Sequence, residues 1–185
     1  MSDPRAPVPG RLTVRQGREA YLAENGFTLE AYDAKWTEAT FLGIPLAVPN
    51  TRHHRWGIML HDLHHVATGY GTDLAGEGEV SAWELRRGIR RLGPYLAGLV
   101  ATGTLVGLLF APRRTIAAWR ASGRGKSLFA TDKSYDELLA MTVAELREEL
   151  GIPAHGLATV RDRHARAPKN ARGDERSVSS NLVGP

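Results

Sequence analysis

The chain has 185 residues and no cysteine, so it suits one domain with a hydrophobic core, and disulfides, thiolate zinc sites and cysteine nucleophiles are excluded. Any metal must therefore be bound by His, Asp or Glu side chains. The net charge is +4, but much of it lies in the basic stretch 154–185, which is typical of a solvated tail. Without interleaved aromatic residues or a recognisable motif, no nucleic-acid partner is predicted.

The first fifty residues predict short helices followed by an extended segment. Residues 1–12 form a Pro-rich lead, predicted to be flexible, without the apolar core of a secretion signal, so a cytoplasmic location is expected. Residues 14–25 and 29–40 each predict a short helix, with Gly26 between them. Residues 41–49 contain two prolines and an apolar run, which favours an extended segment over a helix.

A helix-turn-helix is predicted next. Asn50 or Thr51 can cap a helix that runs to about Thr68, and the Gly-Tyr-Gly turn at 69–71 ends it. Helices joined by so short a turn run antiparallel, so an early residue of the second helix can face a late residue of the first. We therefore expect Glu77 to lie opposite the C-terminal part of the first helix.

The most apolar part of the chain is residues 95–111, which carry no charge and follow Pro94. This run is shorter than the roughly 20 apolar residues of a spanning helix. It predicts a buried core helix, and contact with a membrane surface or a lipid is the alternative. Four arginines precede it and form a basic rim that is either solvated or able to meet an anionic head group: Arg86, Arg87, Arg90 and Arg91.

The last part of the domain predicts further helices. Pro112 can begin one that runs to about residue 121. The pairs Ser134 with Glu137 and Thr142 with Glu145 have the spacing of capping boxes, which predicts two short helices. No alternation of period two is evident, so we predict an all-α fold.

The predicted architecture is a single helical domain at 13–153, in which antiparallel helices surround a buried apolar helix. The metal site is expected on the helix-turn-helix. Residues 154–185 are predicted to form a disordered basic tail.

Chemistry concentrates in the sequence His61-Asp62-Leu-His64-His65, since five of the seven histidines lie at 53–65. Each helical residue turns about 100°, so His61 and His65 share one face, with Asp62 close to it. Two imidazoles one turn apart with a nearby carboxylate suit a divalent metal ion. The alternative is an ordinary polar helix surface.

Two other metal motifs fit less well. The zinc peptidase pattern His-Glu-x-x-His needs a Glu where this chain has Asp62. The His-Asp phosphohydrolases need further ligands from other helices, and downstream of Glu77 the sequence has only His155 and His164.

The pattern His61-Asp62-x-x-His65, eleven residues, Glu77 resembles the signature of the coenzyme Q (ubiquinone) biosynthesis protein 4 family. The similarity extends to Gly-Tyr-Gly-Thr-Asp at 69–73, to Gly-Glu at 76–77, and to Leu-Phe-Ala-Thr-Asp at 128–132. It continues through Leu-rich helices to Gly-Ile-Pro at 151–153, while the tail beyond has no counterpart in the family pattern.

The resemblance implies a divalent ion, usually zinc, bound by His61, Asp62, His65 and Glu77. It also implies a homodimeric protein of ubiquinone biosynthesis, peripheral to the inner face of a membrane. The implied activity is that of a metal-dependent decarboxylase, a lyase that removes the carboxylate from a polyprenylated hydroxybenzoate ring, coupled to hydroxylation of that ring carbon.

Two alternatives stay open beside the enzyme. One is a non-catalytic scaffold that binds a lipid or isoprenoid within a biosynthetic complex. The other is a family member that tailors a natural product in specialised metabolism.

The expected partner is a lipophilic aromatic or isoprenoid small molecule, whose tail the helix at 95–111 would suit. His64 and Tyr70 are candidates for proton transfer at the site, and ordinary packing or hydrogen bonding to the ligands is the alternative role for each.

Overall fold

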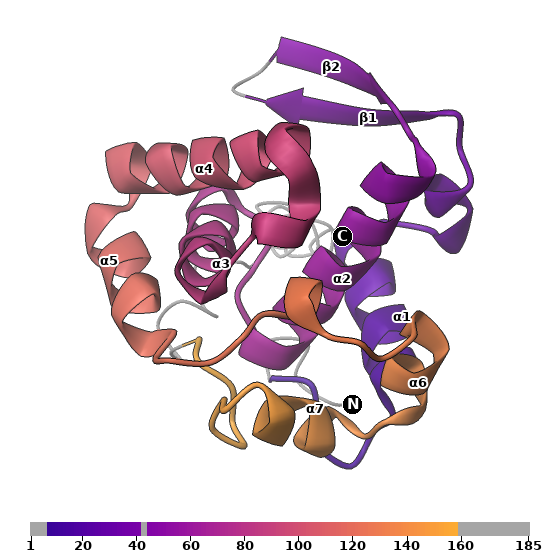
Figure 1. Ribbon diagram of the computed structural model, residues 1–185, viewed down its shortest axis with the longest axis vertical. Coiled ribbons are helices and arrows are strands. Elements are labelled where there is room, and N and C mark those ends of the chain that lie inside the picture. The colour runs from indigo at the N-terminus through magenta and orange to yellow at the C-terminus, as the bar shows by residue number, and fades with distance from the viewer. Residues whose placement is uncertain (1–6, 42–43, 159–185) are drawn as a thin grey trace, which may run out of the picture.

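The computed structural model describes residues 7–41 and 44–158, which form one helical domain (Figure 1). This confirms the predicted all-α single domain, to which the structure adds one β-hairpin. The helices are α1 (Val14–Asn25), α2 (Arg52–Thr68), α3 (Leu74–Arg87), α4 (Gly93–Phe110), α5 (Pro112–Ala121), α6 (Tyr135–Ala140) and α7 (Val143–Glu149). Short 3₁₀ turns are η1 (Leu29–Tyr32), η2 (Arg90–Leu92) and η3 (Leu128–Ala130), and the hairpin strands are β1 (Trp36–Phe41) and β2 (Ile44–Pro49).

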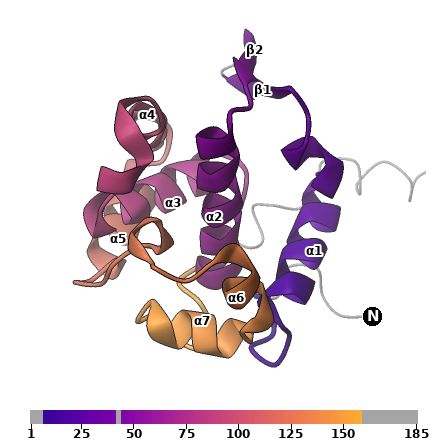
Figure 2. The ribbon, with the colours of Figure 1, turned by 45° about the vertical axis from the view of Figure 1, so that its right-hand side comes forward.

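Helix α2 is the central element, and its ends lie where the sequence predicts them. The Thr51 side chain accepts a hydrogen bond from the main-chain N of His54, and Gly69 ends the helix with φ 77° in the left-handed region. Figure 2 shows α2 between α1 on one side and α3 with α4 and α5 on the other. Both faces of α2 are therefore covered, and seven of its last eight residues are buried.

Helices α3 and α4 pack at backbone distance. A Cβ atom added at Gly78 of α3 would lie 2.4 Å from Cα of Gly107 on α4, and one added at Gly103 would lie 2.4 Å from Oγ of Ser81. Because a side chain at these glycines would overlap the facing helix, the close crossing depends on glycine. This crossing fixes where α3 stands relative to the rest of the domain.

The predicted burial of the apolar helix is only half right. Helix α4 buries the side that faces α3, while its other side exposes large apolar residues: Tyr95, Leu99, Leu105, Leu108, Leu109 and Phe110. The segment Arg90–Phe110 is long and apolar enough to cross a membrane by length and composition, a test that core helices of soluble proteins also pass. Apolar composition alone did not reveal that one side would stay uncovered.

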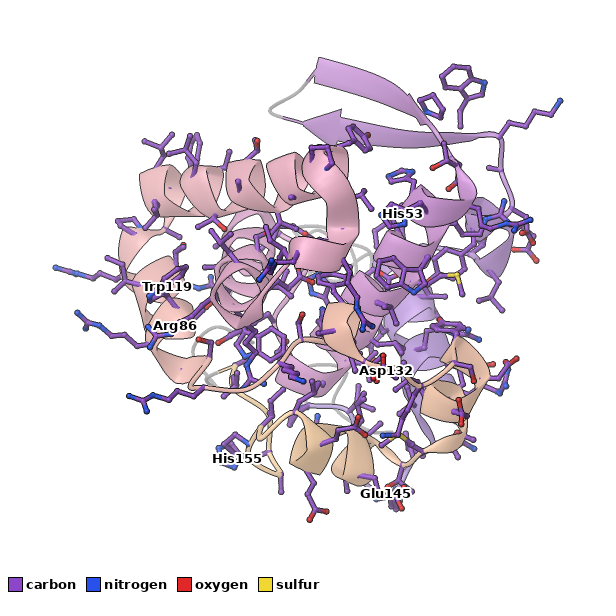
Figure 3. The ribbon with its side chains drawn as sticks, viewed as in Figure 1. His53, Arg86, Trp119, Asp132, Glu145 and His155 are labelled. Carbon is purple, nitrogen blue, oxygen red and sulfur yellow. The ribbon has the colours of Figure 1, made fainter. Side chains whose placement is uncertain are left out.

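The apolar surface continues onto α5. Ile116 and Trp119 are exposed there, and the guanidinium of Arg86 lies 5.6 Å from the ring centre of Trp119. Figure 3 shows Arg86 and Trp119 side by side at the edge of the molecule. We call the exposed apolar residues of α4 and α5 the α4–α5 apolar face.

The predicted helix at 29–40 is wrong. Only η1 is helical there, and β1 then pairs with β2 in an antiparallel hairpin that extends away from the helices (Figure 1). In the predicted extended segment at 41–49, Phe41 ends β1 and Ile44–Pro49 form β2. The sequence of β1, Trp-Thr-Glu-Ala-Thr-Phe, is rich in aromatic and β-branched residues, so an extended neighbour can pair with it and override helix propensity.

Arg147 joins both ends of the described chain to the C-terminal end of α2. Its buried guanidinium donates to the carbonyls of Ala67 (2.9 Å), Val8 (2.9 Å) and Ala154 (2.9 Å). Residues 154–158 of the predicted tail lie against the same helix end, where the main-chain N of Leu157 donates to Thr68. The rest of the predicted tail lies outside the described residues.

Candidate metal centre

Three of the four predicted ligands converge at the contact between α2 and α3. Nε2 of His61 lies 3.1 Å from Nε2 of His65, and the Glu77 carboxylate lies 3.3 Å from the first and 3.4 Å from the second. All three offer ligand atoms within 4.8 Å of one another, so they form a group that could hold a metal ion. As expected, the short turn after Thr68 places Glu77 opposite the end of α2.

These separations match the geometry of metal ligands. Imidazole nitrogens and carboxylate oxygens bind Zn²⁺ at about 2.0–2.2 Å, and two such ligands at tetrahedral or octahedral angles stand about 3.0–3.5 Å apart. The side chain of Glu77 is 40% exposed, whereas that of His65 is fully buried. A cation held here would therefore have protein on the His65 side and open positions towards Glu77.

Hydrogen bonds at the other ring nitrogens orient both imidazoles. Nδ1 of His65 lies 3.0 Å from the main-chain carbonyl of Tyr70, and Nδ1 of His61 lies 2.9 Å from Oε1 of Glu84. A neutral imidazole that donates from Nδ1 presents the lone pair of Nε2, which is the form that binds a metal. When both imidazoles are in this neutral form, their Nε2 lone pairs point into the same small volume, which suits a shared cation.

Glu84 belongs to the candidate site but was not among the residues predicted from the sequence. It is fully buried, and its Oε1 accepts from Nδ1 of both His61 (2.9 Å) and His64 (2.7 Å). Its other oxygen, Oε2, has no hydrogen-bond partner among the described residues. The available signal was its position two turns after Glu77 on the same face of α3.

The structure places His64 behind the metal ligands. It is fully buried, its Nδ1 contacts Glu84, and its Nε2 accepts from the main-chain N of Leu128 at 3.0 Å. Burial lowers the pKa of His64, against the opposing effect of Glu84. With both nitrogens engaged, its surroundings favour a role in holding Glu84, and its predicted role in proton transfer stays a prediction.

Asp62 lies beside the three converging ligands and has other partners. Its carboxylate accepts hydrogen bonds from the hydroxyls of Tyr21 (3.5 Å) and Tyr32. Burial raises the pKa of Asp62, although His61 acts in the opposite direction. Its predicted role as a ligand stays a prediction.

Tyr70, the second candidate for proton transfer, is buried in the hydrophobic core. Its main-chain carbonyl contacts His65, so the residue acts on the metal group through its backbone. The role predicted for its side chain stays a prediction.

The electrostatics of the group favour a cation. Burial alone would lower the pKa of His61, but Glu84 and Glu77 together outweigh it and raise that pKa well above its usual value. Burial alone would raise the pKa of Glu77, but His65 and His61 outweigh it and lower that pKa. The neighbouring imidazoles likewise lower the pKa of Glu84, against its burial. Both carboxylates are therefore ionised at neutral pH. Without a metal ion they favour a proton on His61, which a metal ion would have to displace.

Comparison of the chain with protein-family models, with curated proteins and with solved structures gives no match.

Proposed function

We propose that this protein binds one divalent metal ion, zinc by preference, and acts in the biosynthesis of a quinone or another prenylated aromatic compound. The proposed reaction is decarboxylation of a polyprenylated hydroxybenzoate ring. The observation that carries the proposal is the convergence of His61, His65 and Glu77, with both imidazoles oriented to present Nε2. The resemblance of the motif to the coenzyme Q biosynthesis protein 4 family supplies the substrate class.

The residues define what the site would contribute. His61, His65 and Glu77 would hold the ion, and Glu84 and the Tyr70 carbonyl would orient the imidazoles. Asp62 would lie beside them, hydrogen-bonded to the hydroxyls of Tyr21 and Tyr32. A bound divalent ion supplies Lewis acidity, which withdraws electrons from a coordinated oxygen of the substrate. In a simple decarboxylation carbon dioxide leaves and a proton takes its place, whereas the hydroxylating version needs dioxygen as the oxidant.

The second candidate is a non-catalytic scaffold that binds a lipid or isoprenoid. The α4–α5 apolar face favours it, because large apolar side chains in one exposed patch are typical of interaction sites. The same face would accept the polyprenyl tail of a substrate, so it fits both candidates. The homodimer, the peripheral membrane association and the cytoplasmic location remain predictions.

Metal analysis combined with a turnover assay tests the proposal. Purified protein should contain one divalent ion per chain, and metal-loaded protein with dioxygen should release carbon dioxide from a short-chain prenylated hydroxybenzoate. His65→Ala and Glu77→Ala should lose both metal and turnover while remaining folded. His155→Ala, which changes an exposed histidine outside the site, is the matched control and should behave as wild type.

Two results separate the candidates. Full turnover by metal-free protein would exclude the metal-dependent enzyme. No turnover with any divalent ion, together with a lipid that co-purifies with both wild type and Glu77→Ala, would favour the scaffold.

A further inference from the structure

A buried cation lies on α1 without a buried counterion. Arg18 is 5% exposed, and its nearest acid is Glu19, whose half-exposed carboxylate lies 3.7 Å from Nη2. Nη1 donates to the hydroxyl of Tyr135 at 3.2 Å, while Nε has no hydrogen-bond partner among the described residues. Burying a guanidinium is unfavourable unless its donors are paired, so this donor is available to a partner that none of the described residues supplies.

Arg18 lies one helical turn from a residue that touches the metal group. Tyr21 follows it by three positions on α1, and the two share a face. The Tyr21 ring stacks on the ring of His65, with centres 5.4 Å apart, and its hydroxyl bonds to Asp62. The guanidinium and the candidate metal centre are thus neighbours along the contact between α1 and α2.

Two further phenols connect these groups. Tyr135 contacts Arg18 directly, and Tyr32 contacts Asp62. One phenol is therefore in direct contact with the guanidinium, and another with the carboxylate beside the candidate metal centre.

Only a short surface segment separates Arg18 and its phenol neighbours from solvent. Tyr32 belongs to η1, a single turn whose first residue, Leu29, is exposed, as is Phe27 just before the turn. Tyr32 and Tyr135 are themselves only partly buried. A ligand could reach the guanidinium by displacing one turn of surface chain rather than by opening the core.

The donors of Arg18 fit a carboxylate. Nε–H has no partner among the described residues, and Nη2–H faces only the half-exposed Glu19. These two donors lie along one edge of a guanidinium and can bind both oxygens of a planar carboxylate in parallel. Tyr135 accepts from Arg18 through its oxygen, so its own hydrogen can still be donated to the same ligand. A dianionic phosphate fits less well, because one guanidinium would have to offset its charge close to Asp62 and Glu19.

We propose that Arg18 and Tyr135 form a binding site for the carboxylate of an aromatic acid beside the metal centre. The inference rests on the proposed function, which it extends by naming the group that recognises the acid. The phenol rings of Tyr21 and Tyr32 would line the aromatic ring of this ligand.

Binding of a soluble probe tests the site without turnover. The dissociation constants of 4-hydroxybenzoate and of 4-hydroxybenzamide, which lacks the charge, would be measured by calorimetry on metal-free and zinc-loaded protein. Charge-assisted hydrogen bonds predict tighter binding of the benzoate, and a loss of about tenfold to a hundredfold in Arg18→Gln. Binding of the benzamide should change less than about twofold.

Arg15→Gln is the matched control. Arg15 lies on the same helix with a half-exposed side chain, 4.0 Å from an exposed carboxylate of Asp136, so its loss should leave benzoate binding unchanged. Arg18→Lys keeps the positive charge but lacks the two parallel N–H donors of a guanidinium, so its affinity for 4-hydroxybenzoate should be intermediate. If Arg18→Gln does not fold by circular dichroism, Arg18→Lys and Tyr135→Phe replace it, each with an expected weakening of benzoate binding alone.

The results that overturn the proposal are distinct from a failure of the proposed function. Equal affinity of wild type for the two probes, or unchanged benzoate binding in the Arg18 variants, would overturn it. Binding that depends on Arg18 in metal-free protein would support it even if no metal-dependent turnover were found.

Discussion

The two sides of helix α3 contact their neighbours in different ways. The side towards α2 carries long charged residues, Glu77 and Glu84, which reach the histidines of α2 through side-chain contacts. The side towards α4 is made of small residues, and Gly78 meets Gly107 with the two backbones in contact. The first side contacts its neighbour through long side chains, whereas the second meets its neighbour through the backbone and so determines where the helix lies.

The largest expected effect is on metal binding at the α2 side. Glu77→Gln keeps the size of the side chain but removes the charge of one ligand, so we expect the affinity for zinc to fall by more than about a hundredfold. Against the effect of its burial, His65 and His61 lower the pKa of Glu77, so loss of its charge also weakens the metal-free fold. Because the side chain is 40% exposed, the free energy of unfolding in the presence of a chelator should fall by only about 0.5–1 kcal/mol. Competition with a chromophoric chelator and thermal melts measure the two quantities.

Unchanged zinc affinity in Glu77→Gln would contradict the assignment of this ligand. A large loss of stability without metal would show that the charged side of α3 also supports the fold.

The next effect is on stability at the α4 side. In Gly107→Ala the new Cβ would lie 2.6 Å from Cα of Gly78 and 2.7 Å from Oγ1 of Thr115. Overpacking of this kind destabilises by about 1–3 kcal/mol, and we expect the upper end because the contact is with backbone. Chemical denaturation measures the change, and a variant as stable as wild type would contradict the close crossing.

A smaller effect is expected from the buried carboxylate behind the ligands. Glu84→Gln removes the charge that accepts from both His61 and His64, so zinc affinity should fall by about tenfold to a hundredfold. The visible spectrum of the cobalt-loaded protein should also shift, since the orientation of His61 changes. Glu79→Gln is the matched control, because Glu79 is equally buried on α3 but pairs with Arg114.

A Glu84→Gln variant with wild-type affinity and an unchanged cobalt spectrum would remove Glu84 from the metal group. A shift of equal size in Glu79→Gln would show that the effect comes from the helix as a whole.

The smallest expected effect is a gain in stability. Gly98 lies on α4 with nothing within 4 Å of an added Cβ, so Gly98→Ala should stabilise the protein by about 0.5–1 kcal/mol through helix propensity alone. Chemical denaturation of Gly98→Ala and Gly107→Ala measures the same substitution at two positions of α4, one in open space and one that faces the backbone of α3. Destabilisation by Gly98→Ala would mean that its surroundings are not open.

Signals within a few residues of one another predicted the structure well. The capping boxes begin α6 and α7, with Ser134 and Thr142 each accepting from the residue three positions on. Thr51 and Gly69 delimit α2, and the short turn that follows brings Glu77 to His61 and His65. These features depend on local hydrogen bonds and helix geometry, which sequence spacing encodes directly.

Features that depend on distant partners were missed. The hairpin needs β2 to pair with β1, and the contact between His64 and Leu128 joins residues 64 positions apart. Apolar composition alone left open how much of α4 would be covered, because this depends on how many neighbours pack against it. The sequence around Arg18 does not indicate a binding site, because its donor becomes buried and unpaired only in the folded structure.

The guanidinium of Arg147 has a consequence for the order of events during synthesis. It joins the end of α2 to Val8 near the start of the described chain and to Ala154 near its end. A nascent chain would have the residues of the metal group outside the ribosome well before Arg147 and Ala154 emerge. The hydrogen bonds that Arg147 adds at the C-terminal end of α2, close to His65, can therefore form only after nearly all of the described chain has emerged.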